Sequence, residues 1–94
     1  MKPYTKTYMR FFGYTIADWI QCEIPDCGGK AVDIHHIWAR SIVSELFDSI
    51  RNLMGLCRSC HSKYGDKKQH REFLQDIHDK KMAEVNKNGD EATN

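Results

Sequence analysis

Short blocks of apolar residues, separated by turns, predict the strands of this chain. Residues 30–37 follow a Gly-Gly pair and contain three β-branched residues, which favours a short strand. Residues 53–56 form a second brief apolar run that suits another strand. Because successive residues of a strand point to opposite sides, Asp33 and His35 are expected on one side and His36 on the other.

Apolar spacings of three and four predict helices elsewhere. Residues 41–50 read as an amphipathic helical segment that starts from a Ser41 cap, and residues 57–64 have a helix-compatible composition. A longer helix is predicted over 67–85, with Gly89 as a stop signal after it. Its apolar face is predicted to contain Phe73, Leu74, Ile77, Met82 and Val85.

The length of 94 residues predicts one domain rather than two. Within it, residues 1–21 are rich in aromatic side chains and are expected to form a flap over the core, although their spacing does not decide between helix and strand. Residues 22–85 carry the main α+β unit. The polar segment 86–94 is predicted to be disordered.

Composition gives a globular balance, with 40% hydrophobic and 29% charged residues and a formal net charge of +1. Positive charge is local: five basic residues and one acid lie between Arg58 and Arg71. This basic patch suits phosphate binding or a solvated helix face, and charge alone does not separate the two. A domain this small buries a modest core, so a covalent or metal cross-link is expected.

The chain lacks an apolar run long enough to cross a membrane and lacks the pattern of a secretory signal. A cytoplasmic protein that is not bound to a membrane is therefore expected. In that compartment cysteines hold metals more often than they form disulfides.

Four cysteines form two knuckles, Cys22 with Cys27 in a turn rich in Gly and Pro, and Cys57 with Cys60 as a C-x-x-C pair. Two turns that each present two thiolates are the usual way to form a tetrahedral zinc site. Four thiolates leave no open coordination position for water, so the zinc is expected to be structural. Two disulfides or buried free cysteines are the alternatives. Zinc binding, worth on the order of 10 kcal/mol, would supply most of the stability of a domain this size.

Histidines stand beside both knuckles: the pair His35-His36 ends the first strand, and His61 directly follows Cys60. The order of Cys22, Cys27, VDIHHI, RNLMGLC and CRSCH over residues 22–63 resembles the signature of HNH endonucleases that carry a zinc knuckle. The resemblance implies a ββα-metal (His-Me finger) fold with flanking helices. It also implies hydrolysis of phosphodiester bonds, with DNA as the expected substrate and RNA left open.

Residue roles follow from the same resemblance, position by position. It makes His35 and His61 ligands of a catalytic divalent cation and His36 the general base that activates water. Asn52 takes the middle N of the motif, with a supporting catalytic role, and Arg40 resembles an arginine that contacts the substrate phosphate. The cation is expected to be Mg²⁺ or another divalent metal such as Mn²⁺ or Ni²⁺, and it would keep several waters because only two protein ligands can be named.

Neighbouring residues suggest supporting roles. Asp33 lies on the side of His35 and could orient that ring, and Lys63, Lys67 and Lys68 would flank a phosphate backbone. Trp38 is better explained by core packing than by contact with a minor groove or sugar.

Two other hypotheses compete with a free-standing nuclease. One is a zinc-stabilised module that binds nucleic acid or protein without catalysis, although such a module needs none of the histidines. The other is an accessory nuclease subunit of a larger phage assembly for DNA packaging or recombination, acting in the host cell. The sequence leaves open whether the chain is a monomer or a homodimer.

Overall fold

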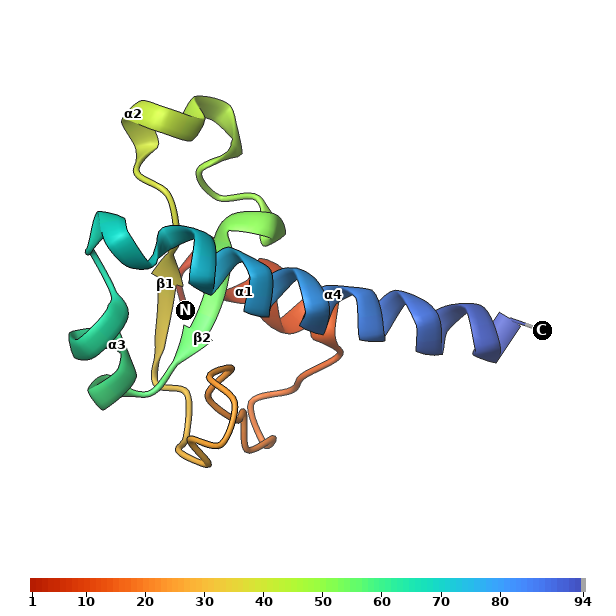
Figure 1. Cartoon of the computed structure of the whole chain (residues 1–94). Helices are drawn as coiled ribbons and strands as arrows, with labels where there is room; N and C mark the ends of the chain where they lie inside the picture. Colours follow the sequence, from red (N-terminus) through yellow and green to blue (C-terminus); the bar gives the residue numbers. More distant parts are fainter. Residues whose placement is uncertain (94) are drawn as a thin grey trace.

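The computed structural model describes the backbone of residues 1–93 and the side chains of residues 1–85. Over this range the chain forms the predicted α+β fold, with a two-stranded sheet and flanking helices (Figure 1). The elements are α1 (Pro3–Phe12), β1 (Asp33–His36), α2 (Arg40–Val43), the 3-10 turns η1 (Ser44–Leu46) and η2 (Ile50–Asn52), β2 (Leu53–Leu56), α3 (Arg58–Tyr64), the 3-10 turn η3 (Lys68–His70) and α4 (Arg71–Thr93).

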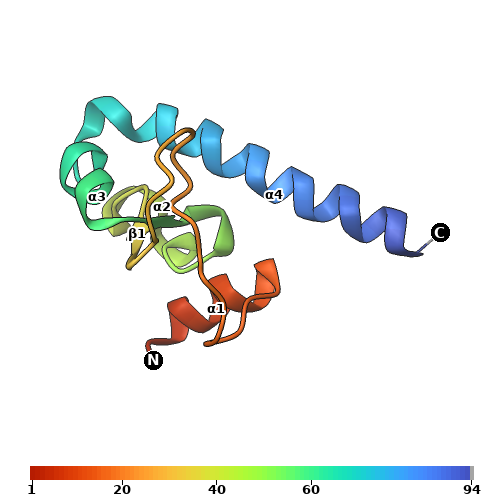
Figure 2. The same ribbon diagram turned by 90° about the horizontal axis from the view of Figure 1, so that it is seen from below.

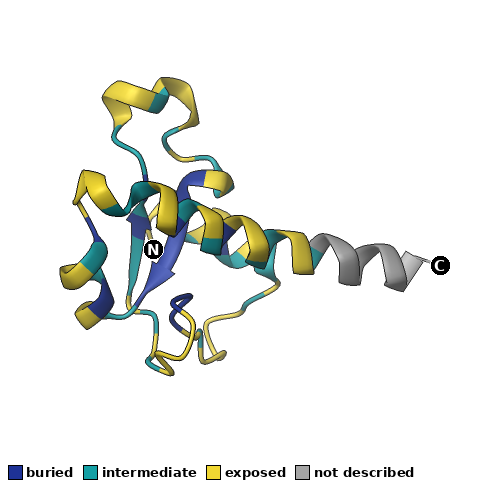
Figure 3. Cartoon of the chain, in the orientation of Figure 1, coloured by how far each residue is buried: buried dark blue, intermediate teal, exposed yellow. Residues whose placement is uncertain are grey.

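The sheet is an antiparallel pair in which Asp33 lies opposite Leu56 and His36 opposite Leu53. All four residues of β2 are buried, and this strand forms the centre of the molecule (Figure 3). Both predicted strands are confirmed, but β1 is shorter than residues 30–37. Lys30 instead forms an isolated bridge with Gln21.

Helices α1 and α4 lie on opposite sides of the sheet (Figure 2). Helix α1 settles the local structure of the N-terminal segment, which the spacing of its residues left open. Pro3 stands in its first turn, where a missing N–H costs nothing, and Gly13 ends it in the left-handed conformation at φ 72°. Tyr8 of this helix is fully buried, so the segment packs into the core.

The connection between the strands departs from the predicted helix over 41–50. Helix α2 starts one residue earlier, with Ala39 at its N-cap and no cap from Ser41. It stops at Ser44, whose φ of 48° is left-handed and incompatible with a continuing α-helix. The helix predicted over 41–50 from its apolar spacing is therefore wrong: Ile42 and Leu46 are exposed and do not form a buried face.

Helix α4 begins at Arg71, after η3, and its backbone continues past Gly89, so that glycine does not end the helix. Its buried face agrees with the predicted one at Leu74, which is buried, and differs at two positions: Phe73 is 46% exposed, and His78 is buried. The predicted disorder of segment 86–94 falls on residues whose side chains, and at 94 the backbone too, lie outside the described part of the chain, and it stays a prediction. Even with α4 included, none of the described helices combines the length and the apolar character needed to cross a bilayer.

A buried polar network joins α1, β2 and α4 at Glu23. One carboxylate oxygen accepts hydrogen bonds from the Tyr8 hydroxyl and from the Gly55 backbone N–H, the latter at 2.8 Å. The other lies 2.8 Å from Nδ1 of His78, whose Nε2 donates to the carbonyl of Ile50 at 2.6 Å. Every polar atom of this network has a partner, so burial of the charged groups is compensated.

Gly55 is required for this arrangement, because a Cβ at that position would lie 2.7 Å from the Tyr8 hydroxyl oxygen. Burial, reinforced by the Glu23 carboxylate, raises the pKa of Tyr8 above its ordinary range, so its hydroxyl remains a donor. The network thus fixes α1 and α4 to the same carboxylate.

The geometry predicts that Glu23→Gln costs about 1 kcal/mol or less of unfolding free energy, because the amide can accept from Tyr8 and Gly55 and donate to a neutral His78. His78→Leu leaves the carboxylate buried without its partner and is expected to cost about 3 kcal/mol. Urea denaturation of both variants measures the difference. Equal losses would contradict this account of the network.

Candidate functional site

The four cysteines converge at the start of α3, where the loop of Cys22 and Cys27 meets Cys57 and Cys60. Their four sulfur atoms lie within 4.8 Å of one another, with Cys27 Sγ 3.7 Å from Cys57 Sγ and 3.6 Å from Cys60 Sγ. A tetrahedron with Zn–S bonds of about 2.3 Å requires sulfurs about 3.8 Å apart. The cluster therefore fits a metal such as zinc, as its spacing predicted, and all four thiols are free of disulfides.

The chemistry of these thiols also suits a cation. Cys57 caps α3, and the backbone N–H of Cys60 donates to its sulfur at 3.4 Å, which lowers the pKa of Cys57 to about 7. Burial raises the pKa of Cys22 and of Cys60. Buried thiols of this kind lose their protons when a cation binds, so metal binding and folding are coupled.

A second site is a cleft of about 400 Å³ at the end of β1. It holds the three histidines that the sequence singled out, His35, His36 and His61, and also Arg40. The structure thus brings together residues up to 26 positions apart, counted from His35 to His61. Two further charged residues line it, Asp66 and Arg71.

His35 is buried, with 4% of its surface exposed, and its ring centroid lies 4.9 Å from that of His61. Burial, followed by the neighbouring His61 imidazole, lowers the pKa of His35 to about 4. His35 is therefore uncharged at neutral pH. This is the form of imidazole that binds metals.

His61 follows Cys60 directly and is oriented by Asp33, whose Oδ2 lies 3.1 Å from Nδ1 of His61. A carboxylate at one ring nitrogen fixes the tautomer that leaves the other nitrogen, Nε2, as the free ligand atom. The sequence had associated Asp33 with His35, and the structure corrects this. Gly65 makes room for the ring, because a Cβ there would lie 2.5 Å from Cδ2 of His61.

His36 is held by three contacts. Its Nε2 lies 2.9 Å from Oδ1 of Asp48, its ring stacks parallel on Phe47 at 3.9 Å, and Tyr4 meets it edge-on at 4.8 Å. Among the described residues, Nδ1 of His36 has no hydrogen-bond partner. The ring is thus fixed from one side, and its second nitrogen has no partner among the described residues.

Phe47 also makes a cation–π contact with Arg40, whose guanidinium carbon lies 4.2 Å from the centroid of the ring. Because His36 and Arg40 both stack at about 4 Å, they must occupy opposite faces of the same ring. The sequence did not identify Phe47 or Asp48. Both lie in the irregular connection between the strands, where residue spacing carries no signal of contact.

Asn52 is buried and does not line the cleft. Its Oδ1 accepts from the backbone N–H of Trp38 at 2.8 Å, and its Nδ2 donates to the carbonyls of Trp38 at 3.1 Å and Phe47 at 2.9 Å. These bonds join the end of β1 to the loop that carries Phe47. Asn52 is therefore placed to brace the site from behind.

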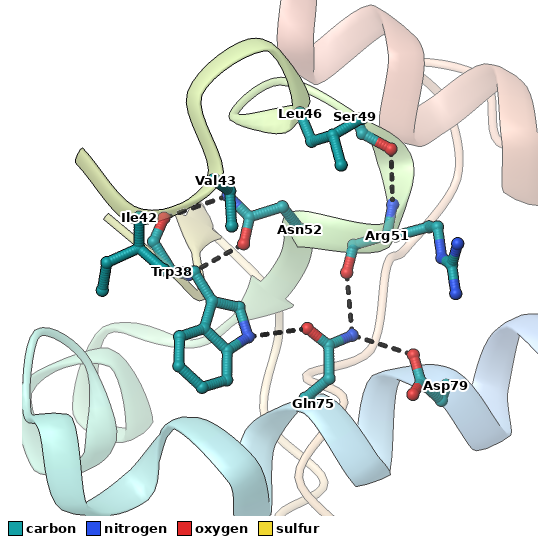
Figure 4. Close-up of a pocket in the computed structure, with 9 residues that line it drawn as sticks. All are labelled: Trp38, Ile42, Val43, Leu46, Ser49, Arg51, Asn52, Gln75 and Asp79. Carbon is teal, nitrogen blue, oxygen red and sulfur yellow. Dashed lines mark hydrogen bonds between the residues drawn. The ribbon is translucent and has the colours of Figure 1, made fainter. Parts of the chain in front are cut away.

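A separate groove of about 430 Å³ lies between this loop and α4 (Figure 4). Its lining is largely apolar, contains no histidine, and shares Trp38 with the cleft. Gln75 crosses it: its Oε1 accepts from Nε1 of Trp38 at 2.9 Å, and its Nε2 donates to the carbonyl of Arg51 and to Asp79, both at 2.8 Å (Figure 4). The groove thus contains the contacts by which α4 fixes Trp38.

The basic patch between Arg58 and Arg71 is divided by the fold. Arg58 pairs with Asp33 at 3.0 Å, and Lys67 donates to the carbonyl of Lys63 at 3.0 Å. Of the patch, Arg71 alone lines the cleft among the described residues. The lysines predicted to flank a phosphate backbone therefore lie outside the cleft.

Comparison with known proteins gives one result. The family model described as HNH endonuclease matches residues 20–67, about half of the chain. This segment contains all four cysteines, the three cleft histidines and Asn52, and it leaves out α1 and α4. No curated protein and no solved structure matches the chain.

The cluster predicts that Cys27→Ser, a change at an exposed thiol, removes bound zinc and unfolds the domain, because a binding energy on the order of 10 kcal/mol is lost. Metal analysis and far-ultraviolet circular dichroism measure both effects. His61→Ala is the matched control and should keep its zinc and its fold. Loss of zinc in that control would place His61 in the structural site.

Burial of neutral His35 predicts a pH-dependent stability. Its pKa of about 4 in the folded state lies below the unfolded value of about 6.5, so stability is lost as the pH falls through this interval. Between pH 7.5 and 5.5 the zinc-loaded protein should lose about 1 kcal/mol more than His35→Gln. Urea titrations at both pH values test this, and parallel losses would show that His35 is not held neutral.

Proposed function

Because the chain belongs to the HNH endonuclease family, we propose that it hydrolyses phosphodiester bonds in DNA, with His36 as general base. The observation that carries this proposal is the convergence of His35, His36 and His61 in one cleft, next to a separate cysteine cluster. A module that only binds needs the cysteines and not this arrangement. Family membership indicates a nuclease. That its substrate is DNA is part of the proposal.

His35 and His61 would hold the divalent cation, Mg²⁺ or a metal such as Mn²⁺ or Ni²⁺. Their fit rests on two observations: His35 is uncharged at neutral pH, and Asp33 leaves Nε2 of His61 free. When bound, the cation would neutralise charge on the phosphate and on the leaving oxygen. The chain supplies few ligands, so waters and substrate oxygens would complete the shell.

His36 would remove the proton from the attacking water. Asp48 holds the Nε2 side of the ring, which leaves Nδ1 as the proton acceptor. The water oxygen forms the new bond to phosphorus, Nδ1 takes the proton, and the bond to the leaving oxygen breaks as that oxygen takes a proton from solvent. Stacking on Phe47 keeps the acceptor in place throughout.

Arg40 and Asn52 would assist in different ways. Arg40 lines the cleft and can donate to a non-bridging phosphate oxygen, whereas Asn52 acts through the backbone of the loop that holds Phe47. The four cysteines would hold structural zinc, because four thiolates leave no position for substrate. Zinc would thus position α3, and with it His61.

A second role, as an accessory nuclease subunit of a larger DNA-processing assembly of a phage, uses the same cleft and the same chemistry. In both roles the residues that would act come from this chain. We therefore assign the reaction to the chain itself.

The protein is expected to nick or linearise supercoiled plasmid when Mg²⁺, Mn²⁺ or Ni²⁺ is supplied. Loss of a general base typically slows such a step by 10²–10⁴-fold, and His36→Ala should show a loss in this range. Gel analysis over time measures the rates, with zinc content as the control for folding. A wild-type protein inactive with every metal, or a His36→Ala variant as fast as wild type, would refute the proposal.

A further inference from the structure

We infer that Arg71, the first residue of α4, is a phosphate-binding residue of the cleft. This rests on the proposed function and extends it to a helix that lies outside the segment matched by the family. The sequence pattern gave phosphate contacts to Arg40 and to three lysines, and neither it nor the family match, which ends at residue 67, assigns one to Arg71.

Position separates Arg71 from the other cations of its segment. It lines the same cleft as His35 and His61, while Arg58 is occupied by Asp33 and Lys68 does not reach the cleft. Among the described residues, Arg71 has no acidic partner within salt-bridge distance. Its charge is therefore available to a ligand.

The ring of Trp38 lies next to the guanidinium of Arg71. The guanidinium carbon of Arg71 lies 5.6 Å from the centroid of the Trp38 ring, within the range of a cation–π contact. Gln75, one helical turn further along α4, accepts a hydrogen bond from Nε1 of the same ring at 2.9 Å. Helix α4 thus makes two contacts with Trp38: Gln75 bonds the edge of the ring, and the guanidinium of Arg71 lies over its face.

The cleft then contains two guanidinium groups that each lie over an aromatic ring, Arg40 at 4.2 Å from the Phe47 centroid and Arg71 at 5.6 Å from that of Trp38. Both are free of acidic partners among the described residues, and each can offer two parallel N–H donors to phosphate oxygens. Phosphodiester hydrolysis adds negative charge to the phosphate in the transition state. Cations fixed before the reaction stabilise that charge without reorganisation.

The test compares Arg71→Ala, Arg71→Lys and the control Lys68→Ala in the zinc-loaded full chain. Cleavage of a DNA duplex of fixed sequence is measured with Mn²⁺ at steady state over a range of duplex concentrations. We expect kcat/KM to fall about 100-fold in Arg71→Ala, mainly through kcat, and to recover only in part in Arg71→Lys, which keeps the charge but loses the fork of donors. Lys68→Ala should stay within about threefold of wild type, because an exposed cation contributes only to general attraction.

The overturning result is Arg71→Ala activity equal to that of Lys68→Ala, with zinc content and thermal stability unchanged in both. Full recovery of kcat/KM in Arg71→Lys would show that the positive charge alone matters. It would overturn the inference that the guanidinium acts through two parallel N–H donors.

A wild-type protein that does not cut refutes the proposed function, and binding of the same duplex over a range of salt then decides on Arg71. Weaker binding with a salt slope reduced by about one in Arg71→Ala, and not in Lys68→Ala, supports a phosphate contact at Arg71. Equal binding by the two variants rejects it.

Discussion

The cysteine cluster is the constraint on which the cleft depends. It joins a loop before β1 to the turn between β2 and α3, and His61 follows Cys60 with no intervening residue. A shift of the start of α3 would therefore carry His61 away from His35 on the neighbouring strand. A metal held by the four sulfurs would thus fix the geometry of a cleft to which it contributes no atom.

The Glu23 network is a second cross-link, and it begins one residue after Cys22. Glu23 binds α1 through Tyr8, β2 through Gly55 and α4 through His78. The loop that supplies two cysteines thus also orders the two helices on opposite sides of the sheet. In a chain with so small an apolar core, these two polar centres supply the long-range order that hydrophobic burial supplies in larger domains.

The sequence allowed the prediction of those parts of the structure that depend on local spacing. The two strands and the four-cysteine cluster are confirmed, and the histidines lie together as the motif implied. Side-chain pairs between separate parts of the chain were not predictable. His36 pairs with Asp48, which lies in a connection broken at Ser44, and His61 of α3 pairs with Asp33 of β1. The apolar face of α4 was wrong at Phe73, since a pattern that counts only apolar residues cannot anticipate a buried ionisable group at His78.

Phe47 separates a histidine from an arginine, with His36 on one face of its ring and Arg40 on the other. Evolution of these positions should therefore be coupled. A lineage that replaces the ring with an aliphatic side chain loses two supports at once, and it would need a new way to hold both groups. Substitutions at 36, 40 and 47 should consequently covary in divergent relatives. The order of motifs along the chain does not reveal this link.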